Sequence, residues 1–83
     1  MKGNHMTEEG NMKERIGLAA GKVWEMLKAN GEMDISALTK KMDERSVIVQ
    51  QALGWLARED KIDYDLKGKK IFVTLSEHEK NGH

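Results

Sequence analysis

Apolar side chains between residues 12 and 59 recur at the three- and four-residue spacing of helices. The first predicted helix covers residues 12–30, and one face of it holds Ile16, Ala20, Val23 and Leu27. Asn30-Gly31 follows, a pair that tolerates the left-handed conformation with which helices commonly end. The pattern therefore predicts one amphipathic helix that stops at a defined point.

Two shorter helices are predicted next, after an extended piece at residues 32–33. The second helix covers residues 35–42 behind Asp34, whose side chain can cap it, and its buried stripe is Ile35, Leu38 and Met42. The third covers residues 44–59, with Asp43 as the expected N-cap. Its buried face is Val49, Ala52, Leu53 and Leu56.

Beyond residue 60 the period changes from 3.6 to 2, which is typical of strands. A two-residue loop at Gly68-Lys69, with Gly first, suits a type II′ turn and predicts a hairpin. The cross-strand pairs are then Leu66 with Ile71, Tyr64 with Val73, and Ile62 with Leu75. A slip of one residue would break all three apolar pairs, so the register is well specified.

The predicted element order is α, short β, α, α, β, β, which is the order of an α+β winged helix-turn-helix. The chain has 83 residues, enough for one small core. We place the domain at residues 13–75, between flexible tails at 1–12 and 76–83.

Composition excludes several functional classes. Lys+Arg and Asp+Glu are both 14, and there is no cysteine. The longest uncharged stretch, Ser46 to Ala57, is too short to span a bilayer, and the polar N-terminus has no apolar leader segment, so we expect no membrane association and a cytoplasmic location. The three histidines, His5, His78 and His83, all lie in the predicted tails. None of them has a second metal ligand at helical spacing, so no metal site is expected.

Catalysis is not expected either. The sequence shows no nucleophile with a base and no phosphate-cradling glycine motif. Asp63 and Asp65 share one face of a strand, which the alternation of a solvated hairpin explains. The chain is therefore expected to have no catalytic residue and no cofactor.

Residues 52–62, Ala-Leu-Gly-Trp-Leu-Ala-Arg-Glu-Asp-Lys-Ile, are the most specific segment of the chain. Together with Gly17 and the Gly21-Lys22-Val23-Trp24 piece, they resemble a family of small bacterial and archaeal winged helix-turn-helix proteins of unassigned function. The resemblance covers about residues 13–75 and implies the fold and a nucleic-acid role. Two features depart from common helix-turn-helix chains: the turn at residues 42–44 lacks glycine, and Asp60 stands where a glycine is frequent, although Asp tolerates the left-handed region.

In a helix-turn-helix, the second helix of the motif enters the major groove of DNA. The side of the third predicted helix away from its buried face carries polar groups that can read base edges, and the candidates are Arg45, Ser46, Gln50 and Gln51. Glu44 and Glu59 balance the arginines of this helix, so it is expected to be neutral overall.

Phosphate contacts are expected from a second set of residues: Lys40, Lys41, Lys67, Lys69 and Lys70. Lys67 and Lys70 should face each other across the hairpin, which costs a little stability. A phosphate at the wing tip would turn that cost into attraction. The alternative is a solvated turn whose charges keep a strand edge from pairing with other chains.

Gly17 and Gly21 lie inside the first helix, where glycine costs about 1 kcal/mol relative to alanine. With Trp24 they form one flank, and this flank packs closely either against the same subunit or across a homodimer interface. On the third helix, Ile48 and Trp55 form a second apolar stripe, for which a core position is the commoner outcome and self-association the alternative.

Two functions remain. The first is a small transcriptional regulator that binds double-stranded DNA. The second is a module that binds a protein partner through the same helix face, without DNA. Clustering of the five lysines with Arg45 would favour DNA, whereas dispersed lysines and an exposed Trp55 would favour protein.

Overall fold

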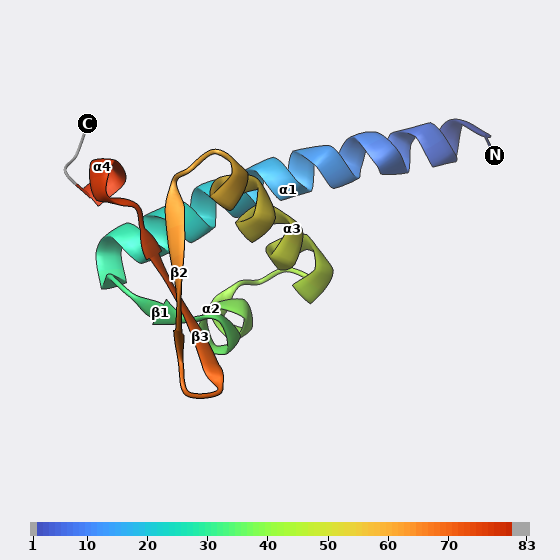
Figure 1. Cartoon of the computed structure of the whole chain (residues 1–83). Coiled ribbons are helices and arrows are strands. Elements are labelled where there is room, and N and C mark those ends of the chain that lie inside the picture. The colour runs from blue at the N-terminus through green and yellow to red at the C-terminus, as the bar shows by residue number, and fades with distance from the viewer. Residues whose placement is uncertain (1, 81–83) are drawn as a thin grey trace.

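The computed structural model describes the backbone of residues 2–80 and the side chains of residues 11–77 and 79. Its elements, in order, are α1 (Lys2–Asn30), β1 (Met33–Asp34), α2 (Ile35–Lys41), α3 (Ser46–Arg58), β2 (Ile62–Lys67), β3 (Lys70–Leu75) and α4 (Glu77–Lys80) (Figure 1). The predicted α+β winged helix-turn-helix is confirmed. The side chains of His5, His78 and His83, for which no metal was expected, lie outside the described ones, and the flexibility of the two tails stays a prediction.

α1 is longer than the hydrophobic pattern indicated. It begins at Lys2 rather than at residue 12, and its first turns run out beyond the rest of the fold (Figure 1). Apolar periodicity marks only the part of a helix that packs on a core, whereas the backbone hydrogen bonds of a helix can continue through any segment without proline. Residues 2–11 contain no proline.

The predicted helix ends are confirmed at two of three places. Gly31 takes φ +79 and its N–H donates to the Leu27 carbonyl at 2.7 Å, closing α1. The Asp34 carboxylate accepts from the Ser36 N–H at 2.9 Å and caps α2. The prediction for α3 was wrong, because Arg45 occupies the N-cap position and not Asp43.

The sheet has the order β1-β3-β2, and both of its pairings are antiparallel. All three predicted cross-strand pairs of the hairpin are confirmed: Ile62 with Leu75, Tyr64 with Val73, and Leu66 with Ile71. Gly68 has φ +63 while Lys69 does not have a positive φ, as a type II′ turn requires. Asp60 takes φ +61, so the left-handed conformation that Asp was expected to tolerate there is adopted.

The core lies where the three longer helices meet the inner face of the sheet. The largest of its fully buried side chains are Val23, Leu27, Leu38, Ile48, Val49 and Val73. The outer part of the hairpin extends beyond this core, so Tyr64, Leu66 and Ile71 are exposed although they continue the same apolar face. α2 packs against β1 and β3. It therefore lies between the β2–β3 hairpin, which is the wing, and the start of α3 (Figure 1).

Candidate nucleic-acid interface

The outward side of α3 is open along its whole length. Its exposed residues are Ser46, Val47, Gln50, Gln51, Gly54 and Arg58, preceded by exposed Arg45. None of residues 45–58 is acidic, because Glu44 and Glu59 both fall outside the helix. This face therefore presents hydroxyl, amide and guanidinium groups with no carboxylate among them, which is the set of groups that can contact bases and phosphates.

Glu44, which the sequence suggested would neutralise the helix, is held by α1. Arg15 donates to its carboxylate through two nitrogens, Nε at 3.1 Å and Nη2 at 2.5 Å. Glu44 Oε1 also accepts from the Arg45 N–H at 2.8 Å. The Arg15 hydrogen bond, then that of the Arg45 backbone, lower the pKa of Glu44 to about 2. One carboxylate thus ties α1 to the first turn of α3, and its charge is balanced there.

The Arg15–Glu44 pair is expected to make the fold acid-sensitive between pH 4.5 and 2. A carboxyl whose pKa is lower in the folded than in the unfolded chain contributes stability that is present above its unfolded pKa, near 4.5, and is lost as the pH falls through about 2. Thermal unfolding of the wild type should show this loss, and Glu44→Gln should show a shallower pH dependence over the same window. Glu25→Gln removes an exposed carboxyl of α1 and serves as the matched control. Equal pH profiles for the two variants would contradict the assignment.

The lysines of the wing are not equivalent. Lys67 and Lys70 do face each other, as predicted. Lys67 Nζ donates to Glu32 Oε1 at 2.9 Å and lies 5.1 Å from the centre of the Phe72 ring. Lys70 Nζ is 3.9 Å from Asp34 Oδ2. The residues beside and within β1 therefore relieve the repulsion at the wing.

The hydrogen bond with Glu32 is also the main cause of the raised pKa of Lys67. Sequence reasoning missed this pair because Glu32 and Lys67 are 35 residues apart and meet only through the β1–β3 pairing. The other expected phosphate-binding lysines differ. Within the described part of the chain, Lys40, Lys41 and Lys69 are exposed and form no ion pair, and the same holds for Arg45. These four cations are free to meet phosphate.

Gly17 and Gly21 on α1 do not pack closely against the part of the chain that the structure describes. A Cβ added at either would meet none of its atoms within 4 Å. The expectation that they fit closely against α3 or the wing of the same subunit is therefore wrong, while the dimer alternative stays a prediction. Trp24, on the same flank, is half-buried and donates from Nε1 to Glu79 Oε1 at 2.6 Å.

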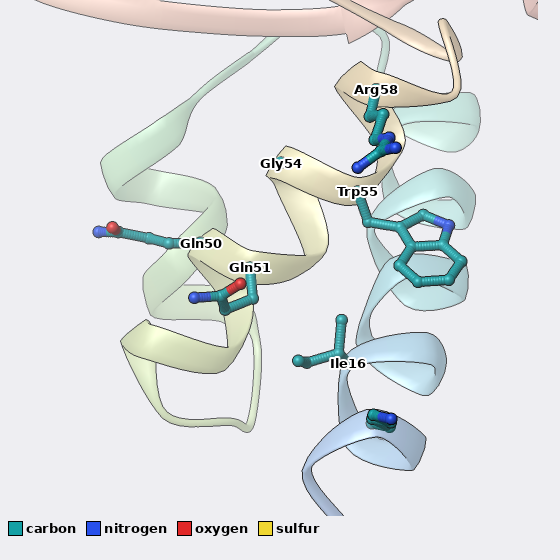
Figure 2. Close-up of a pocket in the computed structure, with 7 residues that line it drawn as sticks. Ile16, Gln50, Gln51, Gly54, Trp55 and Arg58 are labelled. Carbon is teal, nitrogen blue, oxygen red and sulfur yellow. The ribbon is translucent and has the colours of Figure 1, made fainter.

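Trp55 is also placed differently from the commoner expectation. Ile48 is fully buried, but the Trp55 side chain is 57% exposed. Its indole projects from α3 toward α1 and forms part of an open groove of about 790 Å³ (Figure 2). The residues that line this groove are Lys13, Ile16, Gln50, Gln51, Gly54, Trp55 and Arg58. Figure 2 shows the indole reaching over α1 while Gln50 points away from it, toward the outward face of α3. The turn of the helix thus gives α3 one polar face and, next to it, one face with an exposed aromatic ring.

The described residues do not form either of two other kinds of site. None of their helices combines the length and apolar character needed to cross a membrane. In the same part of the chain, no group of three His, Cys, Asp or Glu side chains is placed to hold a metal ion.

Comparisons with known proteins agree with this architecture. Residues 10–75 match the family described as winged helix-turn-helix domain (DUF2582). An uncharacterised protein of Methanocaldococcus jannaschii is 44% identical over 66 residues, which cover 76% of this chain and 91% of that protein. Among solved structures, the transcriptional regulator HlyU from Vibrio vulnificus has a TM-score of 0.60 at 24% identity, covering 98% of this chain and 90% of HlyU. The last likeness is one of fold.

Proposed function

Since the chain belongs to the DUF2582 family of winged helix-turn-helix domains, we propose that it binds double-stranded DNA as a small transcriptional regulator. One observation carries the proposal: the outward face of α3 is exposed, polar and free of carboxylates. A helix of this kind fits the major groove, where base edges offer hydrogen-bond donors and acceptors. The fold and its structural neighbour support a DNA-binding role without catalysis, and we infer a cytoplasmic location with access to DNA.

Base contacts are assigned to the N-terminal half of α3. The amides of Gln50 and Gln51 can bond an adenine edge in two places, and Arg45 can do the same with guanine. The Ser46 hydroxyl can donate a hydrogen bond to either base edge or accept one from it. The N-terminal end of α3 also carries the positive end of the helix dipole, which favours a nearby phosphate.

Phosphate contacts are assigned first to the lysines that form no ion pair with a described residue, Lys40, Lys41 and Lys69. Lys67 and Lys70 are second, because a phosphate there competes with Glu32 or Asp34. Lys67 and Lys70 therefore add less to affinity than their place in the wing suggests.

The test is fluorescence anisotropy of a labelled random-sequence duplex at low salt. Non-specific binding should appear in the micromolar range, and Lys41→Glu and Lys69→Glu should each weaken it about tenfold. Lys28→Glu, on the part of α1 beside Trp24, is the matched control and should change affinity less than about twofold. Absence of binding by the wild type up to tens of micromolar would remove the DNA proposal.

We also propose that the chain acts as a homodimer. Helix-turn-helix dimers read two half-sites about one turn of DNA apart, which gains specificity that a single short helix lacks. The flank of α1 with Gly17, Gly21 and Trp24 is the proposed contact, since a Cβ at either glycine would meet no atom of the described residues within 4 Å.

Binding of a protein partner is the second candidate, and the exposed indole of Trp55 is the observation that favours it. In that case Trp55→Ala would abolish partner binding and Lys69→Glu would not. The two functions are separable because Trp55 and the wing lysines lie on different elements.

A further inference from the structure

Glu44 places a carboxylate at the start of α3, the part of the helix to which base contacts are assigned. It directly precedes Arg45, the N-cap residue of α3, and its side chain is 19% exposed. The N-terminal end of a helix attracts negative groups, and a DNA phosphate is one of them. A free carboxylate at this point would compete with phosphate for the end of the helix and repel it.

Arg15 reaches this carboxylate from α1. Its Nε and Nη2 donate to the two different oxygens of Glu44, at 3.1 and 2.5 Å. The planar guanidinium matches a carboxylate in this two-point arrangement, which a lysine cannot reproduce. The contact therefore fixes where the Glu44 carboxylate points and balances its charge at the side of α1.

Arg45 is the cation that Glu44 would otherwise hold. Glu44 Oε1 already accepts from the Arg45 backbone N–H at 2.8 Å, and the charge of Arg45 is one of the smaller causes that lower the pKa of Glu44. The Arg45 side chain is exposed and forms no ion pair with any described residue. Without Arg15, the carboxylate has this guanidinium as its nearest partner along the chain.

We propose that Arg15 is a positioning residue for DNA binding: by holding Glu44 it leaves the guanidinium of Arg45 free for DNA and keeps a carboxylate away from the phosphate backbone. The inference rests on the DNA binding of the proposed function. Arg15 lies on α1, outside the two helices of the helix-turn-helix motif, so it acts through Glu44 and needs no contact with a base.

Asp43 offers a matched comparison within the same turn. It carries the same charge one residue earlier, is exposed, and forms no ion pair with Arg15. It lines a hollow along α1 together with Lys22 and Glu25. Replacing Asp43 or Glu44 by its amide changes the net charge equally, so the two substitutions separate overall charge from the Arg15 contact.

Anisotropy with the labelled random-sequence duplex at about 50 mM salt tests the proposal. Arg15→Gln should weaken binding about tenfold and make the log–log salt slope shallower by about one, because Glu44 then withholds Arg45 from phosphate. Glu44→Gln should bind at least as tightly as the wild type. The double variant Arg15→Gln/Glu44→Gln should return to within about threefold of the wild type, whereas Arg15→Gln/Asp43→Asn, of the same net charge, should stay as weak as Arg15→Gln.

An NMR titration of the Glu44 carboxyl measures the contact without DNA. Its pKa should be about 2 in the wild type and should rise toward 4.5 in Arg15→Gln, because the largest cause of the lowered pKa is removed. An unchanged pKa in Arg15→Gln would overturn the inference.

The DNA titrations can also overturn the inference by themselves. Equal weakening in Arg15→Gln, Glu44→Gln and their double variant would mean that the pair only ties two helices together, and the proposed DNA binding would stand without this role for Arg15. A wild type that binds no duplex would remove the DNA proposal and this inference with it, even where the pKa of Glu44 rises as expected.

Discussion

Binding to a random-sequence duplex is expected to weaken about 150-fold when the salt concentration rises from about 50 to 200 mM, because each neutralised phosphate contributes about −0.9 to the log–log slope. Four cations on the proposed interface have no carboxylate partner among the described residues: Lys40, Lys41, Arg45 and Lys69. They give a slope of about −3.6. Anisotropy titrations at four or more salt concentrations measure it.

The structure adds a sharper comparison between two lysines of the wing. Lys69→Ala should make the slope shallower by about one, since a free cation is lost. Lys67→Ala should change the slope by clearly less than one. Lys67 donates a hydrogen bond to Glu32, and this bond has to break before Lys67 can contact a phosphate. Equal changes for the two variants would contradict the ion pair as an influence on binding, and a wild-type slope near zero would contradict phosphate contact.

Leu38→Ala is expected to destabilise the fold by about 3 kcal/mol, within the usual range for a leucine in a core. Leu38 is 0% exposed and belongs to the core cluster between α2 and the remaining elements. Its loss leaves a cavity that a short helix can fill only by moving the turn before α3. In a domain whose total stability is roughly 4–12 kcal/mol, this is a large share.

Urea unfolding followed by circular dichroism measures this effect. Leu18→Ala provides the control, because the same chemical change at an exposed site of α1 should alter the free energy of unfolding by less than about 0.5 kcal/mol. Comparable losses for the two variants would contradict the central place of Leu38.

The fold was predictable because its signals are local. Alternation in residues 62–75 and one glycine-led turn specified the hairpin register, pair by pair, and the structure has the same pairs. The cap at Asp34 and the left-handed residues at Gly31 and Asp60 were likewise readable from residue type. The start of α1 was not, since a helix outside the core leaves no apolar pattern to mark it.

The candidate site was predictable only in part. Exposure of Gln50 and Gln51 follows from helical periodicity alone. The charge of the site does not follow from periodicity, because it depends on which carboxylates reach which cations. A count along the chain made the third helix neutral, whereas in the structure Arg15 takes up Glu44 from a helix 29 residues away.

The sequence by itself determined the order of the elements, the strand register and the buried faces, because each is set by side chains a few residues apart. Only the tertiary structure decided which lysines are free, whether the glycines of α1 have neighbours, and where Trp55 stands. Those outcomes depend on distances between segments far apart in the chain, such as Glu32 and Lys67. Helical periodicity predicts which side chains point away from the polar face of a helix. It does not show whether other parts of the fold cover those side chains. Trp55 is 57% exposed because no other element of the described chain covers it fully.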